Sequence, residues 1–286
     1  MNFTIIGGDL RSVKICKILS KQGNNIYTYA LENAEEINEH KDIKVCDTLE
    51  EAIEKSENII LPTPFSKDGQ FVHTVYTNNK LNIDEVLSKI KKEQKIFVGA
   101  IQNNIKEKYK DLQIIDLMKL EEVAVLNTIA TAEGTIEIAI RETQKNIQGS
   151  KILVLGFGRV AKVVAQKFKA LDAKVTCAAR KQEDFAWIET LGLEYTNINQ
   201  LNEEIGKYDI IINTVPELIL KEEQLKNVQK QTLLIDLASK PGGIDFEVAK
   251  KLELKCIWAL ALPGKVAPIS TAEILVKSIL KNIWKT

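Results

Sequence analysis

Residues 151–161 (KILVLGFGRVA) constrain the fold more than any other segment of the chain. A short apolar run is followed at once by a Gly-x-Gly-x-x-Ala turn and then by an amphipathic stretch, residues 162–171. This order is typical of the strand, glycine turn and helix start of a dinucleotide-binding βαβ unit. Gly156 permits the tight turn, Gly158 lets a pyrophosphate approach the backbone, and Ala161 is small enough for close helix–strand packing. The helix N-terminus offers N–H groups to phosphates, so the sequence predicts a bound dinucleotide.

The residues after the second strand of this unit indicate which dinucleotide binds. An NAD site usually carries Asp or Glu about 20 residues beyond the glycines, but this chain has Arg180 and Lys181 there. Because guanidinium gives paired, charge-assisted bonds to phosphate, the sequence favours NADP(H) over NAD(H). The alternative is that both cations are solvated and pair with Glu183 and Asp184. The predicted cofactor-binding residues are Gly156, Phe157, Gly158, Arg159, Val160, Arg180, Lys181, Thr214, Val215 and Pro216.

Strand-like and helical segments alternate along the whole chain, which is typical of parallel α/β sheets. We expect strands at residues 2–6, 25–29, 58–61, 95–98, 113–116, 151–155, 174–179, around Tyr195, 210–213, 233–236 and 255–258. We expect helices at residues 11–22, 48–54, 82–92, 160–171, 183–191, 198–205, 221–226 and 246–252. The predicted fold class is therefore α/β, with two doubly wound parallel-sheet domains joined by a long helix, the second being a Rossmann dinucleotide-binding domain.

The same pattern predicts the domain limits. Residues 1–120 form an N-terminal α/β substrate or catalytic domain, and residues 121–147 form the connecting helix. Residues 148–268 form the Rossmann NADP-binding domain, and residues 269–286 form a C-terminal helix that packs back toward the N-terminal domain. Ligands of such sheets bind beyond the carboxyl ends of the strands, so we expect both sets of strand-end loops to face one cleft.

Composition excludes several classes of partner. The 39 Lys and Arg residues balance the 39 Asp and Glu residues, so nucleic acid is not an expected partner. No apolar run approaches the roughly 20 residues that span a bilayer, and the N-terminus lacks signal-peptide features, so we expect a cytoplasmic protein without a membrane partner. The four cysteines are scattered and His40 and His73 are far apart, so we expect reduced thiols and no metal site.

Polar residues in the first half and in the connecting helix are candidates for substrate binding and catalysis. Asp9 can cap the first helix after a glycine pair, and Arg11 can grip a carboxylate; the alternative is a capped helix with a surface arginine. Thr63 is the only hydroxyl of a loop stiffened by two prolines. Thr131 and Glu133 lie in a small-residue run of the connecting helix. A partly desolvated Glu133 would have a raised pKa and could act as a general acid or base, the alternative being a glutamate favoured by the helix dipole.

Two loops of the second half add candidate cations. Ser239 and Lys240 follow the fifth strand, before a glycine pair, and Lys265 lies in a further loop at residues 262–268. Both lysines suit the carboxylates of a small acid, unless they are only solvated. The predicted catalytic residues are thus Glu133, Lys240 and Lys265, and the predicted substrate-binding residues are Asp9, Arg11, Thr63, Thr131 and Ser239.

Seven short motifs, taken together and in order, resemble the A-subunit family of dipicolinate synthase from endospore-forming bacteria. They are GGDLR at residues 7–11, TAEG at 131–134, LGFGR at 155–159, AAR at 178–180, INTVP at 212–216, DLASKPGGID at 236–245 and LPGKVAP at 262–268. The resemblance covers nearly the whole chain, and the last two motifs are its most specific parts.

The resemblance implies an NADP-dependent oxidoreductase of sporulation. Its activity would be formation of pyridine-2,6-dicarboxylate (dipicolinate) from dihydrodipicolinate or its hydroxylated tetrahydro precursor. It further implies a small dicarboxylate substrate, a flavoprotein-like B-subunit of dipicolinate synthase as partner, and a place in the cytoplasm of the mother cell; a homodimer is left open. The resemblance itself implies no catalytic residue.

Two alternatives remain at this point. The chain could be a nucleotide-binding regulatory or scaffold subunit whose partner performs the chemistry. It could also be another two-domain NADP-dependent dehydrogenase of a small acid, of the 2-hydroxy-acid or shikimate type. The 2-hydroxy-acid alternative needs a His–carboxylate pair in the cleft, and it is disfavoured because His40 lies in a charged stretch and His73 in a polar loop.

Overall fold

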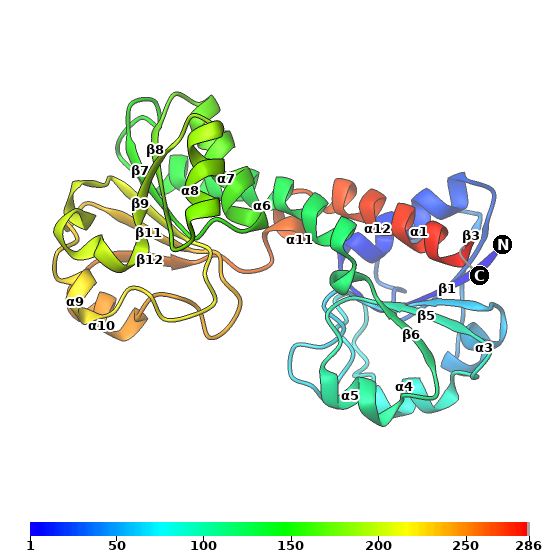
Figure 1. Cartoon of the computed structure of the whole chain (residues 1–286). Coiled ribbons are helices and arrows are strands. Elements are labelled where there is room, and N and C mark those ends of the chain that lie inside the picture. The colour runs from blue at the N-terminus through cyan, green and yellow to red at the C-terminus, as the bar shows by residue number, and fades with distance from the viewer. Residues whose placement is uncertain (285–286) are drawn as a thin grey trace. The chain divides into compact units, whose positions relative to one another are not determined.

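Two six-stranded parallel β-sheets, one in each of two structural units, form the framework of the chain in the computed structural model, which describes residues 1–284 (Figure 1). The first unit comprises Met1–Leu126 and the C-terminal segment from Ala267, and the second comprises Asn127–Val266. The expected α/β class with two doubly wound parallel sheets is confirmed.

The sheet of the first unit has the order β3-β2-β1-β4-β5-β6. Its strands are β1 (Asn2–Ile6), β2 (Asn25–Tyr29), β3 (Ile43–Val45), β4 (Asn58–Ile60), β5 (Lys95–Val98) and β6 (Gln113–Asp116). Its helices are α1 (Leu10–Lys21), α2 (Glu35–Asn38), α3 (Leu49–Glu54), α4 (Ile83–Lys89), α5 (Asn103–Lys108), the 3₁₀ turn η1 (Leu117–Lys119) and α12 (Pro268–Ile283). Because strand order reverses between β1 and β4, these two strands flank the position where ligands bind in open α/β sheets.

The sheet of the second unit has the same strand order, written β12-β11-β10-β7-β8-β9. Its strands are β7 (Lys151–Leu155), β8 (Lys174–Ala179), β9 (Glu194–Asn197), β10 (Ile210–Asn213), β11 (Leu233–Asp236) and β12 (Lys255–Trp258). Its helices are α7 (Arg159–Ala170), α8 (Gln182–Thr190), α9 (Glu222–Leu225), α10 (Phe246–Lys251), α11 (Leu262–Val266) and the 3₁₀ turns η2 (Ile198–Glu203) and η3 (Ile205–Lys207). Here the order reverses between β7 and β10.

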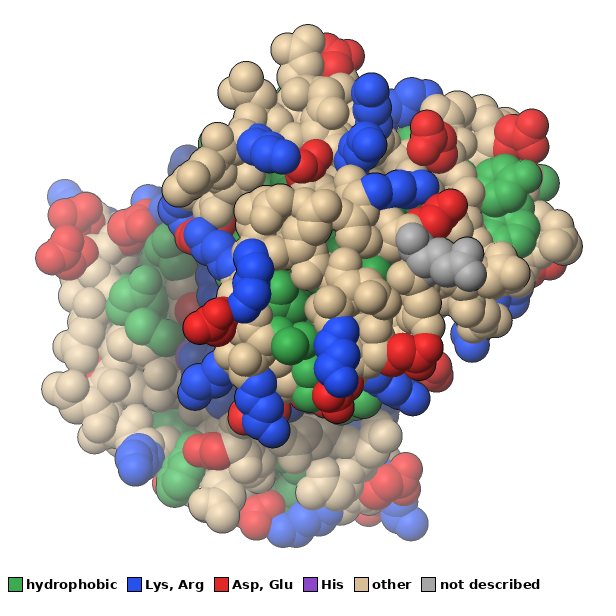
Figure 2. All heavy atoms as spheres, turned by 90° about the vertical axis from the view of Figure 1, so that its left-hand side faces the viewer, with side chains coloured by type: hydrophobic (Ala, Val, Ile, Leu, Met, Phe, Trp, Pro, Cys, Tyr) green, Lys and Arg blue, Asp and Glu red, His purple; other side chains and the backbone are tan. Residues whose placement is uncertain are grey.

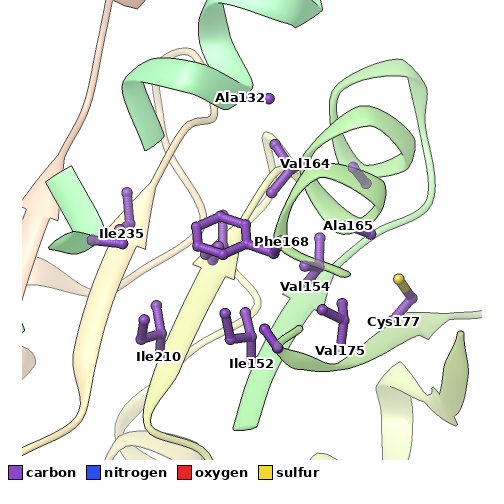
Figure 3. Packing of buried hydrophobic residues seen from close by; sticks show 14 of the residues in the cluster. Ala132, Ile152, Val154, Val164, Ala165, Phe168, Val175, Cys177, Ile210 and Ile235 are labelled. Atoms are coloured by element: carbon purple, nitrogen blue, oxygen red, sulfur yellow. The ribbon is translucent and has the colours of Figure 1, made fainter. Parts of the chain in front are cut away.

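The packing of α7 on β7 shows how the sequence pattern becomes this fold. Four of the five β7 residues are buried, as expected for a strand covered on both faces. On α7, Ala161, Val164, Ala165 and Phe168 are buried, and this three- and four-residue spacing forms one apolar helix face. Figure 3 shows Phe168 and Val164 over the side chains of β7 and β10, the arrangement that closes the core of the second unit.

Helix α6 (Glu121–Glu142) begins in the first unit and ends in the second. Its length and composition would allow it to cross a membrane, contrary to the expectation that no apolar segment is long enough. Half of its apolar window is nevertheless buried inside the protein, as in a helix that packs into a core. In the first unit, α12 packs beside α1 and buries Ala272, Leu275 and Ile279 (Figure 1).

Several short elements differ from the sequence expectations. Helices α2 and α5 and strand β3 were not predicted, because segments of three to six residues carry too little periodicity. Residues 198–203 form a 3₁₀ turn rather than an α-helix. The segment expected to be a loop at residues 262–268 contains helix α11, and the connecting helix ends at Glu142 rather than near residue 147.

Charged side chains of both signs are mixed on one face of the molecule. On the face drawn in Figure 2, Lys and Arg side chains are interspersed with Asp and Glu side chains and form no broad block of one sign. This agrees with the formal net charge of zero.

The cysteine thiols are free, and burial raises the pKa of Cys177 to about 12, so this thiol is unreactive.

Candidate functional site

The glycine turn between β7 and α7 has the geometry of a phosphate cradle. Gly156 has φ +92°, and an added Cβ would lie 2.8 Å from Thr214 Oγ1 and Val215 Cγ2. At Gly158, the residue that caps α7, an added Cβ would meet no protein atom within 4 Å. The α7 N-terminus has neither a side-chain cap nor an acidic residue in its first turn. A helix start of this kind favours an anion through the helix dipole, and the turn fits a dinucleotide pyrophosphate.

Arg180 and Lys181 follow β8 and are both exposed. Lys181 Nζ lies 3.1 Å from Glu183 Oε1. This ion pair is the one expected for Lys181 if the two cations are solvated and pair with neighbouring carboxylates. Arg180 makes no ion pair within the part of the chain that the structure describes, so its guanidinium remains available to a ligand phosphate. Phe157 is buried at the turn, with Lys162 Nζ 5.2 Å from its ring centroid.

A buried polar pair organises the loops beyond β10 and β11. Asn213 Nδ2 donates to Asp236 Oδ1 at 2.8 Å and to Val215 O at 2.9 Å, and Val215 N returns a bond to Asn213 Oδ1 at 3.1 Å. Asp236 also accepts from Ala238 N and Gly243 N at 3.0 and 2.8 Å. Both side chains of the pair are fully buried. They therefore fix the backbone of residues 214–216 and 237–243 beside the glycine turn.

The other predicted residues of the second unit lie on its surface or bond within it. Thr214 Oγ1 donates to Leu155 O at 2.7 Å, so this hydroxyl is hydrogen-bonded to a backbone carbonyl of β7. Pro216, Ser239 and Lys240 are exposed at strand ends, and Lys265 is exposed on α11.

Glu133 does not have the desolvated surroundings expected from the sequence. Its side chain is 53% exposed, and its Oε1 lies 3.0 Å from Lys167 Nζ on α7. A carboxylate that is solvated and ion-paired lacks the partly desolvated surroundings that the sequence led us to expect. Thr131 is half-buried, and its hydroxyl donates to Asn127 O at 3.0 Å within α6.

In the first unit, Asp9 and Arg11 form a closely paired cluster beyond β1. Asp9 caps α1 by accepting from Arg11 N at 3.0 Å. Its two carboxylate oxygens accept from Arg11 Nε at 3.0 Å and from Arg11 Nη2 at 2.6 Å. Burial raises the pKa of Asp9, but the hydrogen bonds and charge of Arg11 outweigh it and hold the pKa below its usual value.

Arg11 is positioned from the β4 side as well. Its Nη2 also donates to Thr63 O, in the loop that follows β4. Thr63 packs so closely on Gly99, which follows β5, that a Cβ on this glycine would overlap the threonine side chain. Guanidinium has five N–H donors, and among the described residues the two on Nη1 have no hydrogen-bond partner. Arg11 is therefore buried and is not a surface arginine. The two N–H groups on its Nη1 can still donate to a ligand carboxylate.

His73 joins this cluster, although the sequence placed it in a polar loop. It is buried, and its Nε2 lies 4.0 Å from Asp9 Oδ2. Gly8 N donates to His73 O at 2.9 Å, and Val75 N donates to Gly8 O at 3.1 Å, so the backbone fixes His73 beside the glycine pair. Burial lowers the pKa of His73, as do the nearby Lys67 and Arg11 charges, against the opposing effect of Asp9.

Sequence reasoning missed three residues of these sites: His73, Asn213 and Asp236. Nothing in the local pattern around His73 indicates burial, because residues 66–80 are mostly polar. Asn213 and Asp236 carried a usable signal, since a polar residue that ends an otherwise apolar central strand needs a buried partner.

Comparisons with known proteins agree with the two-unit description. Residues 2–118 match the family model of the dipicolinate synthase A-subunit N-terminal domain, and residues 137–257 match that of shikimate / quinate 5-dehydrogenase. The second unit is therefore a dehydrogenase-type Rossmann domain, a class that binds NAD(P). The transhydrogenase structure from Sinorhizobium meliloti, at 16% identity and TM-score 0.70, covers 98% of this chain and 93% of that one, and it supports the fold alone.

Two full-length relatives identify the family. The dipicolinate synthase A-subunit of Bacillus subtilis (strain 168) is 33% identical over 285 residues, which cover 98% of this chain and 95% of the relative. The crystal structure of the dipicolinate synthase A-subunit from Bacillus halodurans has a TM-score of 0.92 at 32% identity, covering 100% of this chain and 98% of that one. The chain belongs to the dipicolinate synthase A-subunit family.

Proposed function

We propose that the chain forms pyridine-2,6-dicarboxylate by oxidising dihydrodipicolinate, or by converting its hydroxylated tetrahydro precursor, with NADP⁺ as hydride acceptor. The observation that carries the proposal is the cationic end of β8 beside an open glycine turn, in a chain of this family. Arg180 stands where an NAD enzyme would place a carboxylate, and an added Cβ at Gly158 would meet no protein atom.

The second unit would hold the dinucleotide through residues at the carboxyl ends of β7, β8 and β10. Gly156 to Val160 would receive the pyrophosphate at the start of α7, and Arg180 and Lys181 would pair with the 2′-phosphate. Thr214 to Pro216 would line the ribose on the nicotinamide side. The bound nicotinamide would supply the hydride acceptor that aromatisation of the ring requires.

Cationic side chains are the natural partners of a planar dicarboxylate. In the first unit we assign this role to Arg11, whose Nη1 donors have no partner among the described residues, with Asp9 and Thr63 holding the guanidinium in place. In the second unit we assign carboxylate contacts to Lys240 and Lys265, both exposed, and a hydroxyl contact to Ser239. Such pairing would favour a substrate with two carboxylates over a substrate with one.

The biological setting follows from the family. We propose that the chain acts in the cytoplasm of the mother cell of a sporulating bacterium. We further propose that it works with a flavoprotein-like B-subunit, since the A-subunit name of its relatives implies a multi-subunit synthase.

The test is a stoichiometric assay of the purified chain. It is incubated with dihydrodipicolinate and NADP⁺, with and without the flavoprotein partner, while dipicolinate and NADPH are followed by absorbance. We expect one NADPH per dipicolinate with the chain alone. Product that forms only with the flavoprotein, without nicotinamide reduction, would instead assign the chain to a regulatory or scaffold role.

The assignment of Arg11 is tested by Arg11→Lys. Lysine keeps a cation for Asp9 but removes the planar Nη1 donors, so KM for the dicarboxylate should rise at least tenfold while NADP(H) affinity is unchanged. Lys17→Ala is the matched control, because Lys17 is also a cation of α1 but pairs with Glu36 at 2.7 Å.

A further inference from the structure

We propose that His73 is the group that accepts a proton from the dicarboxylate substrate and that Asp9 stabilises the imidazolium which forms. This inference rests on the proposed function and names a residue for its proton-transfer step. It arises from the contacts that His73, Asp9 and Arg11 make at the carboxyl ends of β1 and β4.

The location is the first argument. Strand order in the first unit reverses between β1 and β4, and the cluster takes Asp9 and Arg11 from beyond β1 and the Thr63 carbonyl from beyond β4. His73 is brought to the same place by its backbone, because His73 O accepts from Gly8 N and His73 N donates to Phe65 O at 2.8 Å. A proton-transfer group is therefore fixed beside the arginine that we assign to a substrate carboxylate.

The arrangement of the three side chains is the second argument. Both oxygens of Asp9 are occupied by Arg11, which fixes the carboxylate plane, and Oδ2 remains 4.0 Å from His73 Nε2. A carboxylate at this distance favours a positive charge on the imidazole when it gains a proton. Neither ring nitrogen of His73 has a hydrogen-bond partner within residues 1–284, so the ring is free to meet a ligand.

The charge state at rest is the third argument. The charged groups that act on His73 are Lys67 of its own loop, Asp9, which caps α1, and Arg11 of α1. Tyr76, at the edge of this cluster, has its pKa raised by burial and by Asp9 and Glu36, so it is uncharged at neutral pH. Burial, Lys67 and Arg11 together lower the pKa of His73, which keeps the imidazole neutral and able to accept a proton near pH 7. Glu133 offers no comparable setting, because it is exposed and paired with Lys167.

The proton balance of the step is simple. One ring C–H bond of dihydrodipicolinate breaks with its electron pair leaving as hydride to the oxidised nicotinamide. A second ring C–H or N–H bond breaks with its electron pair joining the aromatic system, and its proton goes to His73. The products are dipicolinate, the reduced dinucleotide and imidazolium, which then releases its proton to solvent.

The test uses the fact that the chain has only two histidines, His40 and His73. Their ring signals are followed by NMR during pH titration of the full chain, with and without dipicolinate. Dipicolinate should raise the pKa of His73 by adding negative charge beside it and should leave the His40 signal unchanged. In parallel, His73→Gln should lower kcat about 100-fold or more, with KM within threefold, and His40→Gln should keep the activity of the unmutated chain.

The pH profile separates proton transfer from a merely structural role. In the unmutated chain kcat should fall at acid pH, as His73 becomes protonated, and this acid limb should be absent in His73→Gln. Asp9→Asn, which retains an N-cap residue, should shift the acid limb to lower pH because the carboxylate charge is lost. If dipicolinate leaves the His73 signal unmoved, or if His73→Gln keeps kcat within threefold, the inference is overturned. Absence of turnover in the unmutated chain would instead overturn the proposed function, while the NMR titration would still report on His73.

Discussion

Replacing Gly158 with alanine should abolish tight dinucleotide binding and leave the fold intact. Gly158 has φ −78° and ψ −168°, values open to any L-residue, and an added Cβ would meet no protein atom within 4 Å. The stability change has two small terms of opposite sign. Alanine is a poorer N-cap than glycine, which destabilises the fold by up to about 1 kcal/mol. Alanine also lowers the conformational entropy of the unfolded chain, which stabilises the fold by about 0.4–1 kcal/mol. The free energy of unfolding should therefore change by less than about 1 kcal/mol.

The effect on binding should be much larger. If the pyrophosphate approaches the α7 N-terminus over Gly158, a methyl group there separates the phosphate oxygens from the backbone donors. Loss of about two charge-assisted hydrogen bonds costs about 1.5–3 kcal/mol each, or roughly 3–6 kcal/mol together. At about 1.4 kcal/mol per factor of ten, Kd for NADPH should rise about 10²–10⁴-fold.

Gly156→Ala is the matched control, because at this position the tertiary structure predicts a measurable loss of stability. Gly156 has φ +92°, and its Cβ would lie 2.8 Å from both Thr214 Oγ1 and Val215 Cγ2. Left-handed strain of roughly 1–2 kcal/mol and overpacking of about 1–3 kcal/mol should lower stability measurably. Calorimetric titration with NADPH and urea unfolding followed by circular dichroism separate the two variants. An unchanged Kd in folded Gly158→Ala would refute the assignment of the pyrophosphate to this turn.

Three further predictions follow from the same contacts. Arg180→Asp should weaken NADPH binding about tenfold or more relative to NADH, through loss of a charge-assisted bond worth about 1.5–3 kcal/mol; equal calorimetric affinities of the unmutated chain for the two cofactors would contradict this. Asp236→Asn should lower the free energy of unfolding by about 1–3 kcal/mol and weaken NADPH binding, because one of the donors on the buried Asp236 loses its acceptor; urea unfolding with a midpoint equal to that of the unmutated chain would argue against it. Arg11 holds the pKa of Asp9 in the folded chain below its ordinary 3.8. The stability that ionised Asp9 contributes should therefore be complete above about pH 4, which is near its pKa in the unfolded chain. That stability should be lost as the pH falls through the lower pKa of the folded chain. The stability gap between the unmutated chain and Asp9→Asn should therefore narrow in urea titrations from pH 6 to pH 3, and a constant gap would contradict the pairing.

The sequence alone determined the fold class and the class of cofactor. Parallel sheets covered on both faces require apolar strands separated by amphipathic helices. Segments such as β7 and α7 carry this pattern in their local sequence. The signal of the glycine turn is equally local, because both glycines and the small Ala161 lie within residues 156–161. For the same reason the motifs sufficed for the family, whereas the short elements α2, β3, α5 and α11 left no clear pattern.

Only the tertiary structure decided which side chains face one another. His73 and Asp9 are 64 positions apart in the chain, and the pairing of Gly8 with the backbone of His73 brings them together. Whether a polar residue is buried or solvated depends on contacts with distant segments. Glu133 therefore proved exposed on the surface beside Lys167, and Arg11 proved to be buried between Asp9 and Thr63. The pKa values of Asp9 and His73 follow from such burial and from the neighbouring charges, and neither quantity is contained in the local sequence.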